Sequence, residues 1–160
     1  RLMRTVARVL MVFAVVLIGF APRVVAQDDH KIVMPDDIAW SAGPPSLPAG
    51  TEAAVLYGDP TAEGVFALRL KLPADYHIPP HTHPRPEVVT VISGTFRIGM
   101  GETANEEETE DLTAGGFFAF APDTAHFAYT GEETVVQLNS VGPWALEYVN
   151  PEDDPRESGG

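Results

Sequence analysis

Cysteine is absent from the 160-residue chain. Without thiols the protein has no disulfide bonds, and neither a thiolate zinc site nor a cysteine nucleophile is possible. No serine lies in a recognisable nucleophile-elbow motif. Any metal must therefore be held by nitrogen and oxygen atoms, and any catalysis must come from groups other than a cysteine or serine nucleophile.

Basic residues are scarce, with 10 lysines and arginines against 23 acidic residues and a net charge of −13. Four of the arginines lie within residues 1–26, which contain no acid, so the rest of the chain has 6 basic and 23 acidic residues. Its net charge is therefore −17. Such a surface repels nucleic acid and anionic lipid headgroups, so neither is an expected partner.

Long hydrophobic runs are also missing, except at residues 9–20, where the uninterrupted run VLMVFAVVLIGF follows three arginines. Small and aliphatic residues come next, up to Ala26. This order is typical of a secretory signal peptide over residues 1–26, which predicts a secreted or periplasmic protein. An uncleaved membrane anchor is the alternative, although a bilayer crossing needs about 20 apolar residues.

No segment beyond residue 26 has a good helical period. Residues 65–72 instead alternate, with apolar side chains at the even positions and Arg69 and Lys71 between them. Similar short runs, separated by turns, occupy residues 88–92, 96–100, 117–121, 126–130 and 134–141. This pattern predicts an all-β sandwich or barrel. We expect one domain over residues 51–149, an irregular proline-rich arm over 27–50 and a disordered tail over 150–160.

Candidate metal ligands cluster in one segment. His81 and His83 are two residues apart, so both imidazoles lie on one face of an extended strand, and Glu87 has the same parity. Three imidazoles and a carboxylate, with His126 as the third histidine, suit a first-row transition metal. His126 lies 43 residues beyond His83, so only the fold can bring it close. A histidine pair at this spacing also occurs without metal, and His77 is expected outside the set.

These residues resemble the first cupin motif, in which His-x-His, three residues, Glu, six residues and Gly follow one another up to Gly94. The second cupin motif has counterparts in Gly116, Pro122 and His126. Thr124 replaces the glycine usual in its turn, and Pro122 lies one residue nearer the histidine than usual, which puts the shape of the turn in question. Residues 57–60 and 141–144 resemble small exported single-domain cupins similar to the cupin domain of anti-sigma factor ChrR.

The resemblance implies a jelly-roll β-barrel holding one divalent metal (Fe, Mn, Ni, Cu or Zn). It carries over His81, His83, Glu87 and His126 as ligands. Inward positions of the same strands would form a substrate pocket, for which the candidates are Phe96, Met100, Phe118, Phe120 and Gln137. The aromatic members of that set can equally belong to the core.

Fold alone does not set function. The leading interpretation is a metalloenzyme of oxygenase, lyase or isomerase type, dioxygenase-like, acting on a small organic molecule. Glu87 would then be a movable ligand that accepts a proton. The alternatives are a module that binds or senses a metal or small ligand without catalysis, and a barrel whose metal is only structural. By analogy with the family, we expect a homodimer.

Overall fold

The computed structural model describes residues 30–157, and the signal peptide predicted over residues 1–26 lies outside this range. Residues from Lys31 onward form one compact unit. Eleven strands are described: β1 (Ser41–Ala42), β2 (Glu52–Tyr57), β3 (Gly64–Leu72), β4 (Tyr76–Thr82), β5 (Glu87–Ser93), β6 (Thr95–Met100), β7 (Glu110–Thr113), β8 (Phe117–Phe120), β9 (His126–Thr130), β10 (Thr134–Gly142) and β11 (Glu147–Tyr148).

The only helical segments between residues 30 and 157 are three single 3₁₀ turns, η1 (Pro35–Asp37), η2 (Glu106–Glu108) and η3 (Pro151–Asp153). In this part of the chain no helix is long and apolar enough to span a membrane. The prediction of an all-β protein is therefore confirmed.

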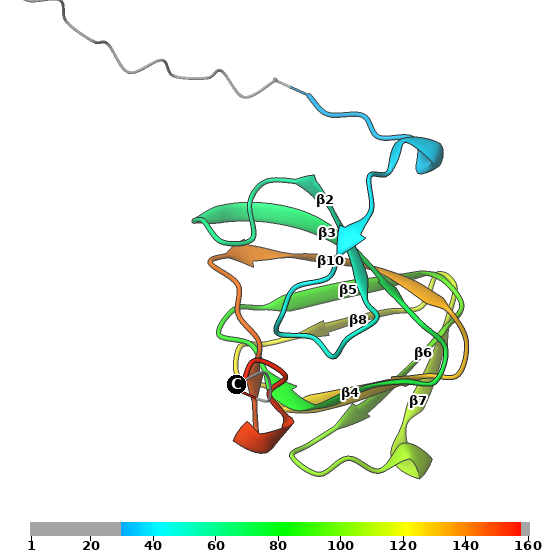
Figure 1. Cartoon of the computed structure of the whole chain (residues 1–160), viewed down its shortest axis with the longest axis vertical. Helices are drawn as coiled ribbons and strands as arrows, with labels where there is room; N and C mark the ends of the chain where they lie inside the picture. Colours follow the sequence, from blue (N-terminus) through cyan, green and yellow to red (C-terminus); the bar gives the residue numbers. More distant parts are fainter. Residues whose placement is uncertain (1–29, 158–160) are drawn as a thin grey trace, which may run out of the picture. The chain divides into compact units, whose positions relative to one another are not determined.

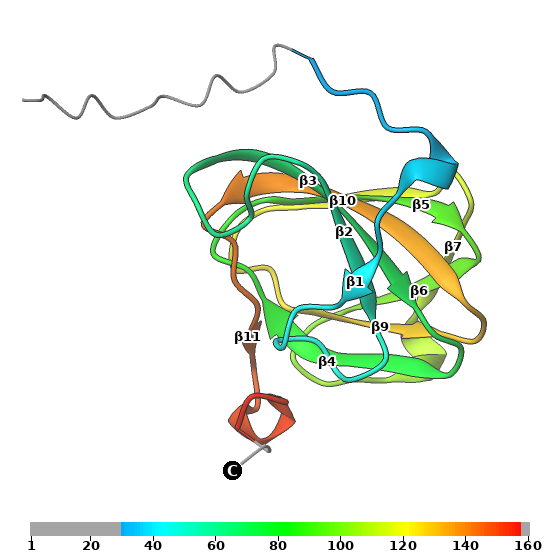
Figure 2. The same ribbon diagram turned by 45° about the horizontal axis from the view of Figure 1, so that its top comes forward.

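Two antiparallel sheets face each other around a common interior (Figure 1). One has the order β1-β2-β3-β10-β5-β8 and the other the order β11-β4-β9-β6-β7. Figure 2 shows β4 and β9 running together on one side, opposite β3, β10 and β5. Each long strand buries alternate residues, as β3 does with Phe66, Leu68, Leu70 and Leu72. The predicted two-sheet, jelly-roll-like barrel is thus confirmed.

A tight contact fixes two neighbouring strands of the second sheet. Gly99 of β6 pairs directly with Phe127 of β9. A Cβ atom at Gly99 would lie 2.2 Å from the Phe127 ring, which is 1% exposed. His126 and Ala128, on either side of Phe127, line the interior, so the Phe127 ring packs on the outer face of this sheet. The Phe127 ring therefore packs directly on the backbone of Gly99.

Parts of the predicted arm and tail contact the barrel. In the predicted arm of residues 27–50, β1 pairs with β2 through Ser41 and Ala53, and Leu47 joins the core at 5% exposure. In the predicted disordered tail, residues 150–157 form η3, and Arg156 donates a hydrogen bond to the Leu146 carbonyl. Both segments are held because they supply apolar or hydrogen-bonding groups to the barrel edge.

A candidate metal centre inside the barrel

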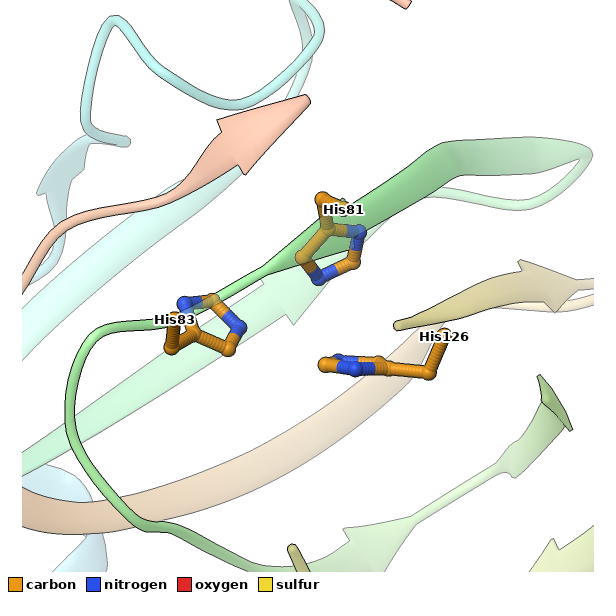
Figure 3. A group of neighbouring side chains, drawn as sticks. All are labelled: His81, His83 and His126. Carbon is orange, nitrogen blue, oxygen red and sulfur yellow. The ribbon is translucent and has the colours of Figure 1, made fainter. Parts of the chain in front are cut away.

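The candidate site lies at one end of the barrel interior, where three strands begin or end. His81 is in β4, His83 follows the last residue of β4, and His126 and Glu87 open β9 and β5. Figure 3 shows the three imidazole rings facing one another. One ring nitrogen from each histidine lies within 4.8 Å of those of the other two. The fold thus brings His126 to the histidine pair.

The turn before β9 links the two motifs. Asp123 adopts a left-handed backbone conformation with φ of 61°, and its N–H donates to the His83 carbonyl at 2.8 Å. Aspartate is one of the few non-glycine residues that tolerate this conformation. The turn is therefore made without a glycine at Thr124, and its hydrogen bond ties His83 to the segment that carries His126.

Each histidine directs one nitrogen away from the site. The Nδ1 atoms of His81, His83 and His126 lie 2.7 Å, 2.8 Å and 2.9 Å from the carbonyl oxygens of Pro79, Ala145 and Thr124, respectively. A carbonyl only accepts, so a hydrogen bond requires each Nδ1 to carry the proton. In a neutral imidazole the other nitrogen, Nε2, then keeps its lone pair.

The carboxylate of Glu87 adds acceptors to the same place. Its Oε1 lies 3.4 Å from His83 Nε2, and its Oε2 lies 3.1 Å from His126 Nε2. Both the His83 Nε2 and the Glu87 Oε2 atoms are buried and have no hydrogen-bond partner within residues 30–157. Groups that only accept are thus gathered in a buried site, an arrangement that a cation between them would stabilise. This donor set fits a divalent transition metal.

Burial lowers the pKa values of two of the imidazoles, those of His81 and His83. All four side chains are nearly inaccessible, from 1% exposed for His126 to 7% for Glu87. Burial, reinforced by the neighbouring His126 and His83, lowers the pKa of His81 well below its ordinary value. Burial also lowers the pKa of His83, against the opposing effect of Glu87. Neutral imidazole is the form that binds metal, so the low pKa values favour coordination at neutral pH.

The cavity beside the histidines is small. Its volume is about 30 Å³, and apart from the site residues its walls are mostly apolar, among them Val89, Leu138 and Trp144. A water molecule needs about 10–15 Å³ on this measure, so the cavity has room for roughly two. In this conformation the interior admits only a group of a few atoms next to the candidate metal position.

The predicted pocket residues do not all line this cavity. Phe96 and Phe118 do, while Phe120 packs against the core with its ring 5.0 Å from that of His126. Gln137 does not, because Val136 and Leu138 occupy the inner face of β10, and its side chain accepts from Arg69 on the other face. Met100 does not either, because it ends β6 and is 54% exposed. Of the residues predicted for a substrate pocket, Gln137 and Met100 therefore lie away from this cavity.

Two further histidines lie outside the site, and one tryptophan lies beside it. His77 lies outside the cluster and stacks on Tyr129 at 4.2 Å, and His30 is an exposed residue at the start of the described chain. Trp144 was not predicted as a site residue, yet its ring stacks on His83 at 4.3 Å with an interplanar angle of 20°. The Gly-Pro-Trp sequence at residues 142–144 was visible, but nothing in the local pattern placed the indole beside a histidine.

The two-sheet barrel, with both histidine motifs on its inner face, defines the chain as a cupin. The chain belongs to the family described as "Domain of unknown function (DUF4437)", whose sequence profile matches residues 20–146. The predicted cupin family is thus confirmed.

Curated relatives of the chain are plant germin-like proteins. Germin-like protein 9-3 and putative germin-like protein 9-2, both from Oryza sativa subsp. japonica, are 33% and 38% identical over 87 and 82 residues. These matches cover 53% and 50% of this chain, but only 40% and 38% of the relatives. The chain thus matches about two fifths of the length of these germin-like proteins.

Solved structures show the same fold. The polyketide cyclase RemF from Streptomyces resistomycificus matches with a TM-score of 0.65 and 18% identity over 80% of this chain and 91% of that one. A putative acetylacetone dioxygenase from Methylibium petroleiphilum matches with a TM-score of 0.60 and 17% identity over 81% and 88%. The ChrR complex from Rhodobacter sphaeroides reaches only 0.49 and 21% identity over 67% and 51%, which assigns no subfamily.

Proposed function

We propose that this cupin is a metal-dependent enzyme that binds one divalent transition metal and acts on a small organic molecule. The ligands are His81, His83, His126 and Glu87. The observation that carries the proposal is the hydrogen-bonding pattern of the histidines, because each Nδ1 is committed to a carbonyl oxygen. Three imidazole lone pairs are thereby set around a buried carboxylate.

When bound, the metal would supply Lewis acidity toward a substrate oxygen, or redox chemistry with dioxygen. The chain's own residues orient the metal ligands and restrict the space beside them. The carbonyls of Pro79, Ala145 and Thr124 fix the imidazole rings, and outer contacts of this kind are worth 10- to 100-fold in metal affinity in other proteins. The apolar walls, which include Phe96 and Phe118, leave room for only about two water molecules beside the site.

Glu87 is the residue for which we propose a proton-accepting role. Its carboxylate contacts two of the three histidines through different oxygens, at 3.4 Å and 3.1 Å. One oxygen can therefore leave its place and take a proton while the other remains near the imidazoles. Oxygenase, lyase and isomerase chemistry all remain in the proposal, and a polyketide cyclase and a putative acetylacetone dioxygenase of similar fold support such variety.

The test of the site is elemental analysis of protein purified without a metal-affinity tag. We expect about one transition-metal ion per chain. The variant His81→Ala/His83→Ala should bind none, and His77→Ala, on the same strand but stacked on Tyr129, should retain it. Stoichiometric metal in the double variant would show that the ions bind elsewhere.

One observation favours a second candidate function, a module that binds or senses a metal without catalysis. The cavity of about 30 Å³ leaves little room for a substrate beside the metal. Water-proton relaxation of the manganese-loaded protein separates the two functions. Rapidly exchanging metal-bound water indicates the open position that catalysis needs, whereas a closed coordination sphere contradicts the enzyme proposal.

We also propose that the protein is exported, on the basis of the predicted signal peptide. Intact-mass measurement of the secreted protein should give a chain that begins at Gln27. A species that still carries residues 9–20 would instead indicate a membrane anchor.

A further inference from the structure

A second and much larger pocket lies beside the candidate metal centre. Its volume is about 440 Å³, and the residues that form it come from β1, β2, β3, the segment between β1 and β2, the 59–61 turn and the chain after β10. Its lining includes Val55, Leu68, Pro60, Trp144, Leu146 and Arg156. Small-molecule sites usually measure about 300–1,000 Å³, so this pocket, unlike the interior cavity, can hold an organic ligand.

The pocket and the interior cavity share part of their walls. Trp144 and Leu146 line both. The Trp144 ring stacks on His83 at 4.3 Å, and the carbonyl of Ala145, another pocket residue, lies 2.8 Å from His83 Nδ1. A ligand in the pocket would therefore contact Trp144 and Ala145, whose ring and carbonyl hold His83 in place.

The charged side chains that line the pocket already have partners. Arg156 binds Asp154 through Nη2 at 2.6 Å and Nε at 2.8 Å. Asp59 Oδ1 accepts from the backbone N–H of Thr61 at 2.8 Å and from its hydroxyl at 2.7 Å. Among the described residues that line the pocket, no unpaired positive charge is available to bind an anion, and the remaining lining is mainly apolar. The chemistry of the walls thus selects a neutral ligand.

Trp144, which lines the pocket, has one polar group without a partner among the described residues. The indole Nε1 of Trp144 is buried and donates no hydrogen bond. An unsatisfied buried donor carries a free-energy cost that an acceptor on a ligand would remove. A carbonyl, ester or amide oxygen is such an acceptor.

We propose that this pocket binds a neutral, mainly apolar small molecule with one hydrogen-bond acceptor, and that Trp144 couples its occupancy to the metal site. The coupling rests on the proposed metal-binding function, whereas binding in the pocket does not. Coupling between two sites is reciprocal, so the ligand and the metal change each other's affinity by the same factor.

The test uses 4-fluoroacetophenone, a neutral ketone, followed by ¹⁹F NMR. Binding should be detectable in the millimolar range, about 1 mM for a fragment of this size. Two probes of similar size, 4-fluorobenzoate and 4-fluorobenzylamine, carry a negative and a positive charge and should bind at least fivefold more weakly. Equal or tighter binding of either charged probe, or no binding of the ketone, overturns the proposal.

A matched pair of variants locates the binding. Val55→Phe fills the pocket from β2, while Val65→Phe makes the same change at an exposed position of β3 that does not line it. Both positions are in strands, where phenylalanine is well tolerated, and melting curves check that both variants fold. Val55→Phe should weaken ketone binding at least tenfold and Val65→Phe should leave it unchanged. Equal effects overturn the assignment to this pocket.

Coupling is measured by repeating the ketone titration with chelated and zinc-loaded protein, and the zinc titration with and without ketone. We expect equal shifts of at least threefold in the two affinities. Zinc binding without any shift overturns the coupling through Trp144. Failure of the protein to bind zinc at all, with ketone binding intact, overturns the metal proposal and leaves the pocket standing.

Discussion

Removing the metal with a chelator at neutral pH should leave the barrel folded. The core is built from apolar side chains of both sheets, among them Phe66, Leu72 and Leu138, all no more than 1% exposed. None of these side chains is a candidate ligand. A domain of this size buries enough surface to fold without staples. We therefore expect metal to add to the stability of a fold that already exists.

The size of the added stability follows from mass action. A ligand at 100 times its dissociation constant stabilises the folded state by about 2.7 kcal/mol. For a domain of roughly 130 residues, each kcal/mol raises the melting temperature by about 3–5 °C. The metal-loaded protein should therefore melt about 8–13 °C above the chelated protein.

The assay is thermal unfolding followed by circular dichroism, with excess chelator or excess zinc. The variant His81→Ala/His83→Ala should show no zinc-dependent shift. His77→Ala is the matched control, because its ring stacks on Tyr129 and its loss should leave the shift intact. If the double variant does not unfold cooperatively, His81→Gln/His83→Gln replaces it.

Two results would refute this reasoning. A chelated protein that is unfolded at room temperature would make the metal structural and remove the main support for an enzyme. A zinc-dependent shift that persists in a folded double variant would place the stabilising metal elsewhere.

Three further predictions concern pH, packing and assembly. Acid should destabilise the metal-free protein, since burial lowers the pKa values of His81 and His83 and the unfolded chain then binds more protons below about pH 6.5. Each group contributes at most about 1.4 kcal/mol of stability per pH unit. This pH dependence, measured by urea unfolding from pH 7 to 5, should be absent in His81→Gln/His83→Gln. Gly99→Ala should cost about 1–3 kcal/mol because its Cβ meets Phe127, whereas Gly131→Ala, in open space, should cost little by the same denaturation assay. Light scattering should give the mass of a dimer, and a monomer would contradict that expectation.

The sequence predicted those parts of the fold that depend on local alternation. The expected strand over residues 65–72 lies within β3, and its apolar residues at the even positions face the core. His81 and His83 could be paired from their spacing alone. His126 could not be placed beside them from spacing, because its approach depends on the pairing of β4 with β9. Only the family resemblance predicted that His126 joins the site.

Other features were beyond reach of the pattern because they depend on tertiary contacts. Gln137 is an exception, because the alternation of Val136 and Leu138 along the strand already assigns it to the outer face. The place of Met100 depends on where β6 ends. Trp144 lies outside any strand, so no periodicity could place its ring against His83.

The contact between Gly99 and Phe127 has a consequence for how this family can change over time. Neither position can vary freely, because a larger residue at 99 is tolerated only where the ring at 127 has been lost. Single substitutions at either position should therefore be rare among relatives that keep this sheet, and paired replacements should be over-represented. In an alignment of family members, the packing of the Phe127 ring on the Gly99 backbone should appear as correlated variation at these two positions.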